Sequence, residues 1–130
     1  MTKFICVMKV LFENQVANLS YDILSDSIIS IFKQNCSEKE MENIQTTLVR
    51  NIENYPVSGL IQDVTALSNG FKDSCRSFLK NHPVIRNKVK KIAFIRGEEH
   101  IGEAPEQNIR DCSSLTHAQA WMMRLDDMVA

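Results

Sequence analysis

The stretch that decides the predicted fold is residues 57–78, VSGLIQDVTALSNGFKDSCRSF. Its apolar positions lie three or four residues apart, the spacing of one buried helical face. They are Val57, Leu60, Val64, Leu67, Phe71, Cys75 and Phe78. Gly70 costs a helix about 1 kcal/mol relative to alanine, so we expect a kink or break there. The stretch therefore predicts a long helix of about five turns.

Further helices are predicted before this stretch. Residues 20–34 repeat apolar side chains at helical spacing, with Ser20 as a cap. Ser37 and Glu40 have the spacing of a capping box, and the helix that they start ends before Pro56. Residues 3–17 fit a helix or a strand. We favour a helix, because no other segment offers a convincing partner strand.

The pattern continues to the C-terminal region. Pro83 predicts a helix start and Gly97 its end. Residues 97–113 lack periodicity and are interpreted as one long surface loop. A last helix is predicted from Ser114. The expected fold is therefore an all-α bundle of five to six helices, forming a single domain over residues 1–130.

The total charge hides an asymmetry. The chain has 15 Lys and Arg against 16 Asp and Glu, a net charge of −1. This balance excludes a uniformly basic nucleic-acid binder and a highly charged disordered chain. Residues 71–96, however, contain eight basic residues and a single acidic one, Asp73. The net charge of this segment is therefore +7, and that of the rest of the chain is −8. The eight are Lys72, Arg76, Lys80, Arg86, Lys88, Lys90, Lys91 and Arg96.

This basic segment has several interpretations. It is a solvated helix face, a site for an acidic protein partner, or a surface that binds the phosphates of RNA or DNA. The acidic loop of the same chain could also neutralise it. The segment carries no zinc finger and no aromatic stacking platform, so any nucleic-acid binding is expected to lack sequence preference.

The last helix offers a second candidate surface. Its apolar residues spread over more than one face, and methionine and tryptophan suit adaptable contacts and binding hot spots. The candidate residues are Trp121, Met123, Leu125 and Met128. The alternative is that this helix simply closes the core.

Motifs for catalysis, metals or cofactors are lacking. The four cysteines form no Cys-x-x-Cys pair and are expected to be free thiols in a reducing compartment. Cys112 and His117 could form a nucleophile pair. A catalytic thiol also needs a lowered pKa and an oxyanion site, and the sequence indicates neither. We therefore expect no catalytic residue, no metal site and no cofactor.

The sequence predicts a small non-enzymatic interaction or regulatory protein. It would act by protein–protein binding, with self-association included, and the alternative is a nucleic-acid-binding regulator that uses residues 72–96. No apolar run reaches the roughly 20 residues that a membrane helix needs. The expected location is intracellular: cytoplasmic, or nuclear if the protein binds nucleic acid in a eukaryotic host.

Overall fold

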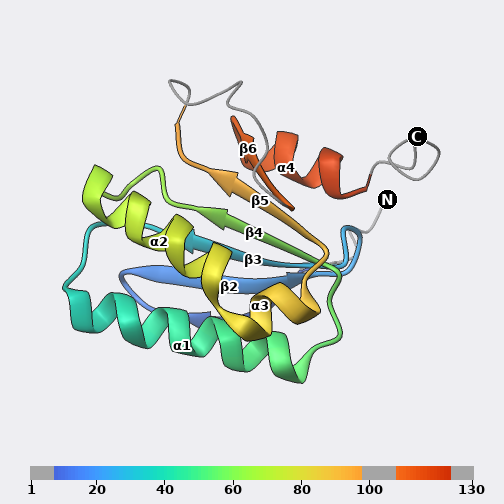
Figure 1. Cartoon of the computed structure of the whole chain (residues 1–130), viewed down its shortest axis with the longest axis horizontal. Helices are drawn as coiled ribbons and strands as arrows, with labels where there is room; N and C mark the ends of the chain where they lie inside the picture. The colour runs from blue at the N-terminus through green and yellow to red at the C-terminus, as the bar shows by residue number, and fades with distance from the viewer. Residues whose placement is uncertain (1–7, 98–107, 124–130) are drawn as a thin grey trace, which may run out of the picture.

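A six-stranded mixed sheet with four helices is the framework of the computed structural model, which describes residues 8–97 and 108–123 (Figure 1). The strands are β1 (Met8–Glu13), β2 (Ala17–Asp22), β3 (Ser27–Phe32), β4 (Gly59–Asp63), β5 (Lys91–Ile95) and β6 (Ile109–Cys112). The helices are α1 (Glu38–Asn54), α2 (Asn69–Asn81), α3 (Pro83–Lys88) and α4 (Leu115–Met122). The predicted all-α bundle is therefore wrong, and the fold is α/β.

The strand order in the sheet follows the chain, β1 to β6. β1, β2 and β3 form an antiparallel meander, while β3, β4, β5 and β6 are parallel. A parallel connection needs a crossover of a dozen or more residues. α1 is the crossover from β3 to β4, and α2 with α3 is the crossover from β4 to β5.

The sheet separates two apolar cores. α1, α2 and α3 cover one face, where Phe32, Leu48 and Phe94 are buried in the larger core. α4 covers part of the other face, where the smaller core includes Ile29 and Ile61. α4 packs mainly on β4, β5 and β6, and Gln119 of α4 also reaches Asp22 at the end of β2.

The predicted helix over residues 20–34 is a hairpin of β2 and β3. Leu24, assigned to the helical stripe, lies in the exposed turn. β3 faces helices on both sides of the sheet, and five of its six residues are buried. A strand buried on both faces shows no alternation, and its apolar run mimics a helical stripe. The segment 3–17 was also favoured as helix, but its residues 8–17 contain β1 and the turn into β2, and residues 3–7 lie outside the described part of the chain.

The stretch 57–78, predicted as one long helix, contains a strand and the first part of a helix. Its first part is β4, in which Leu60, Ile61 and Gln62 are all buried. Only the second part is helical, and α2 begins at Asn69, where a break was expected. The helix predicted from Pro83 starts there but ends at Lys88, and β5 follows.

Two of the expected helix caps are confirmed, whereas Ser20, expected to cap a helix over residues 20–34, lies inside β2. Ser37 Oγ accepts a hydrogen bond from the Glu40 amide, and the Glu40 carboxylate accepts one from the Ser37 amide, so the capping box of α1 is confirmed. Ser114 caps α4 through the His117 amide. In the predicted loop 97–113, β6 occupies 109–112, while residues 98–107 lie outside the described part of the chain.

Candidate functional site

Five large apolar side chains are exposed in the described residues, two on β1, two in the β2–β3 turn and one at the end of α4. They are Met8 (36% exposed), Val10 (57%), Ile23 (59%), Leu24 (65%) and Met123 (47%). We call these five residues the edge patch. A contiguous apolar surface on a protein of this size marks an interaction site more often than scattered apolar residues do.

The strand register places two of these residues on the same face as Asp22. Met8 pairs with Asp22, and Val10 pairs with Ser20, so both point to the face of β2 that carries Asp22. Ile23 and Leu24 directly follow Asp22 in the β2–β3 turn. Figure 1 shows this turn and the C-terminal end of α4 at the same end of the molecule.

Asp22 ties the turn to α4. Its buried carboxylate accepts hydrogen bonds from Ser25 Oγ at 2.6 Å and Gln119 Nε2 at 3.0 Å. Met123 lies one turn after Gln119 and donates its amide to the Gln119 carbonyl. The bond from Gln119 therefore joins the C-terminal part of α4 to the β2–β3 turn.

Asp26 fixes the other end of the turn. Its φ of 49° lies in the left-handed region, which aspartate tolerates better than most residues. Its carboxylate accepts from Tyr21 Oη at 3.1 Å and from the Ser58 amide at 3.2 Å. Its carbonyl also accepts from the amides of Ser58 and Gly59 at the start of β4. The two patch residues of the turn, Ile23 and Leu24, are thus held by a hydrogen-bonded loop, which limits the entropy lost on binding.

The predicted C-terminal surface is only partly present. Met123 is exposed and belongs to the edge patch, whereas Leu125 and Met128 lie outside the described residues. Trp121 is half-buried and packs against the smaller core. Lys91 Nζ lies 5.1 Å from its ring centroid, and the Arg110 guanidinium lies 5.6 Å away. Trp121 therefore contributes to the packing of α4 on the sheet.

The basic segment is divided by the fold. Arg76 of α2 pairs with Asp111 of β6 at 2.6 Å, and Arg96 pairs with Asp73 at 2.7 Å. Lys72 is buried, and Lys91 Nζ donates to the Trp121 carbonyl at 3.3 Å. An acidic partner within the chain, one of the alternatives considered above, is therefore present for Arg76.

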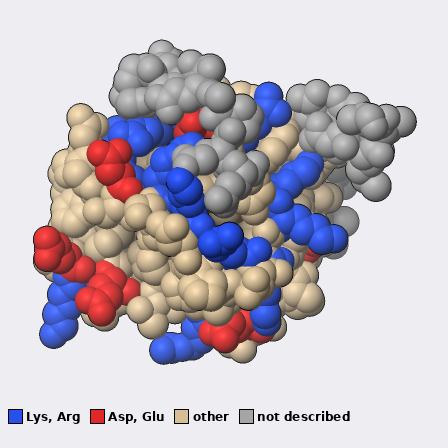
Figure 2. All heavy atoms as spheres, viewed as in Figure 1, with Lys and Arg blue, Asp and Glu red and all other residues tan. Residues whose placement is uncertain are grey.

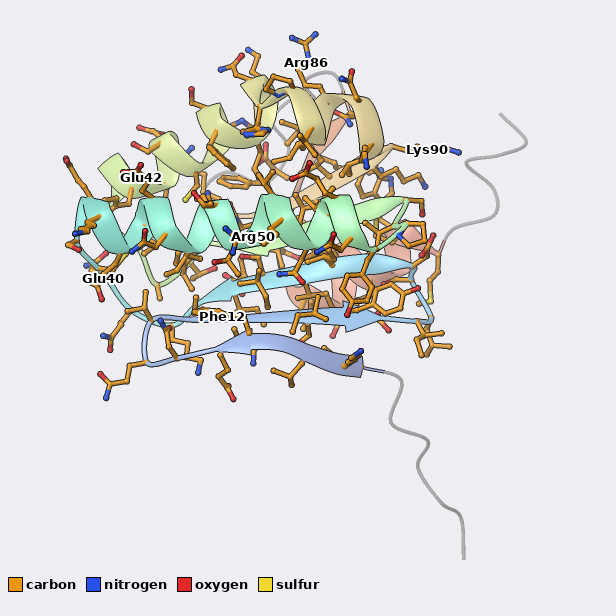
Figure 3. All side chains as sticks on the ribbon, turned by 90° about the horizontal axis from the view of Figure 1, so that it is seen from below. Phe12, Glu40, Glu42, Arg50, Arg86 and Lys90 are labelled. Atoms are coloured by element: carbon orange, nitrogen blue, oxygen red, sulfur yellow. The ribbon has the colours of Figure 1, made fainter. Side chains whose placement is uncertain are left out.

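The remaining basic residues lie near α3. Arg86, Lys88 and Lys90 are exposed, and Lys80 is half-buried. Figure 3 shows Arg86 and Lys90 pointing away from the body of the molecule, and Figure 2 shows Lys and Arg atoms interrupted by acidic and uncharged surface. Lys88 and Lys90 line a cavity of about 470 Å³ together with Asp26 and Glu53, so its charge is mixed.

The described cysteines are free thiols in apolar surroundings. Burial raises the pKa of the Cys75 thiol to about 12 and that of Cys112 to about 11. Burial also raises the pKa of Cys36, which is less enclosed. These directions oppose thiolate formation, so the pairing of Cys112 with His117 lacks an activated nucleophile. Among the described residues, no group of three or more His, Cys, Asp or Glu could hold a metal ion.

We expect the free energy of unfolding to fall as the pH rises from about 9 towards 12. The pKa of Cys75 is raised from 9.0 to about 12 by folding, so the unfolded chain loses this proton first. The stability that the protonated thiol contributes is complete below pH 9 and is lost as the pH approaches the folded-state pKa. Urea unfolding of the wild type and Cys75→Ala at about pH 7.5 and about pH 10.5 measures this loss. The variant should lose less stability; an equal loss in both would contradict the assignment.

Sequence reasoning missed most of the edge patch. Leu24 was assigned to a buried helical face, and Val10 lay in a segment favoured as helix. The available signal was the Asp22–Asp26 run, D-I-L-S-D, whose Asp and Ser residues favour a turn between two apolar segments.

Comparisons with protein-family models, curated proteins and solved structures find no match for this chain. None of the helices in the described ranges is long and apolar enough to span a bilayer.

Proposed function

We propose that this protein is a non-enzymatic binding module that associates with a second copy of its own chain through the edge patch. The observation that carries the proposal is that all five exposed large apolar side chains of the described residues belong to β1, the β2–β3 turn and the end of α4, which lie at one end of the molecule. Burial of apolar area stabilises association by about 25 cal/mol per Å², before the entropic cost of binding is subtracted.

A second copy suits this surface because the patch is largely uncharged and can face itself across a two-fold axis. In an isologous contact the same residues meet in both directions, so apolar residues face apolar residues without a separate complementary surface. Lateral pairing of β1 is less suitable, because a bulge between Val10 and Phe12 and the charge of Lys9 interrupt that edge. We therefore propose that the chains pack through the faces of the patches.

Nucleic-acid binding has less support than this association. Arg76 and Arg96 are paired with carboxylates, and Lys72 is buried. Phosphate binding would depend mainly on Arg86, Lys88 and Lys90, which gives at most a weak, salt-sensitive interaction.

We expect Val10→Glu to shift the protein from dimer to monomer, because each chain would bring a charge into an apolar contact. Light scattering coupled to size exclusion measures the mass. Gln15→Glu is the matched control, since Gln15 is exposed in the same hairpin outside the patch and the charge change is equal. Gln15→Glu should keep the wild-type mass. Equal masses for wild type and Val10→Glu, with unfolding unchanged, would refute the proposed contact.

A further inference from the structure

A groove lies between α1 and α2, and its lining includes none of the edge-patch residues. Its volume is about 320 Å³, in the lower range of ligand cavities. α1 contributes Glu38, Met41, Glu42, Gln45 and Thr46, and α2 contributes Phe71, Ser74, Cys75 and Phe78.

The groove has an apolar floor and one aromatic wall. Met41 and Cys75 are buried at the floor, where Cys75 Sγ lies 3.6 Å from Met41 Sδ. Phe71 and Phe78 are half-buried on the same wall. They are seven residues apart, which separates them by about 10.5 Å along α2. This spacing matches two turns of a helix lying parallel to α2.

The opposite wall is acidic. Glu38 and Glu42 are exposed and lie four residues apart on α1, so their carboxylates share one side of the helix. Figure 3 shows Glu42 on the side of α1 towards α2, and Glu40 on another side. Figure 2 shows acidic atoms near the end of the molecule where α1 begins. Among the described lining residues there is no Lys or Arg, so the groove favours a cationic occupant.

Gln45 adds an unsatisfied polar group to the lining. Its side chain is 4% exposed, and its Oε1 accepts a hydrogen bond from Gln62 Nε2 at 3.1 Å. Its Nε2 has no hydrogen-bond partner among the described residues. Buried polar groups are almost always paired, so this enclosed amide behind the groove is an exception.

We propose that this groove binds a basic amphipathic helix of a partner protein. Apolar side chains of that helix at i, i+3 or i+4, and i+7 lie between Phe71 and Phe78, in the manner of helix-in-groove recognition. Lys or Arg residues beside this stripe face Glu38 and Glu42. The apolar floor supplies affinity, and the two carboxylates exclude acidic helices of the same shape.

A pair of synthetic peptides tests the proposal. The first is a fluorescein-labelled helix of Leu and Lys, about 18 residues or five turns long, with one leucine stripe. The second has Glu in place of every Lys. Fluorescence anisotropy with the full chain, at about 150 mM salt to screen long-range attraction, should show binding of the Lys peptide only. Binding of both peptides with equal affinity, or of neither, would overturn the proposal.

Matched variants locate the binding. Glu42→Lys should lower the affinity for the Lys peptide about tenfold, because an attraction becomes a repulsion at the groove. Glu53→Lys makes the same charge change near the other end of α1 and should leave the affinity unchanged. If both variants weaken binding equally, the interaction is only a response to net charge and the groove is not the site.

Two further variants separate the groove from the fold and from the edge patch. Phe71→Ala should lower the affinity for the Lys peptide at least tenfold. Circular dichroism should show that this variant stays folded. Val10→Glu disrupts only the edge patch and should leave peptide affinity unchanged. Loss of binding in Val10→Glu, with full binding in Phe71→Ala, would place the peptide on the edge patch and refute the groove. Failure of self-association alone leaves the groove result unaffected.

Discussion

Replacing Arg76 with methionine should lower the free energy of unfolding by about 3–5 kcal/mol, the cost of removing one partner of a buried ion pair. The Asp111 side chain is 3% exposed, and its Oδ1 accepts from Arg76 Nη1 at 2.6 Å. Asp111 Oδ2 has no hydrogen-bond partner among the described residues. The variant would therefore leave a buried carboxylate without this compensating charge. Arg76 also lies over the Phe94 ring, at 5.4 Å from the centroid, so its packing is lost as well.

Urea unfolding measures the change in the free energy of unfolding. Two control variants show whether the loss comes from the ion pair. Arg86→Met removes the same side chain from an exposed position and should change stability by no more than about 0.5 kcal/mol. Arg76→Met combined with Asp111→Leu removes both charges and should recover much of the loss. A loss below about 1 kcal/mol in Arg76→Met would show that this ion pair does not stabilise the fold as described.

Replacing Trp121 with alanine should cost about 2–3 kcal/mol, less than a fully buried tryptophan because its side chain is half-buried. The change removes the ring that packs on the smaller core and the cation–π contacts with Lys91 and Arg110. Hydrogen exchange should speed up first in α4, because Trp121 is a main contact of this short helix with the sheet.

Met123→Ala is the matched control for Trp121→Ala. Met123 lies two residues away but is exposed in the edge patch, so its loss should weaken self-association and leave unfolding within about 0.5 kcal/mol. The opposite pattern, in which Trp121→Ala keeps full stability and loses association, would make Trp121 a binding residue, as the sequence first suggested.

Helix caps could be predicted from the sequence better than the arrangement of the strands in the sheet. Ser37 with Glu40, and Ser114, act on backbone amides within a few residues, so their effects are readable without knowledge of the fold. β3, β4 and β5 could not be recognised in this way, because both of their faces are covered and their apolar runs do not alternate.

The candidate surfaces were harder still to predict. Charge density identified the basic segment, but the pairing of Arg76 with Asp111 joins residues 35 positions apart and depends on β6 lying beside β5. The edge patch depends on the register of β1 with β2 and on the bond from Gln119 to Asp22, which spans 97 positions. Long-range contacts of this kind carry no signal in a single sequence.

Sedimentation equilibrium of the wild-type chain is the most direct measurement of the central claim, because it reports mass without assuming a shape. Concentrations up to about 1 mM cover the affinity expected of a small apolar contact. We expect the mass to rise with concentration from 14.9 kDa, the mass of one chain, towards twice that value. A mass that stays at 14.9 kDa over the whole range would contradict self-association through the edge patch.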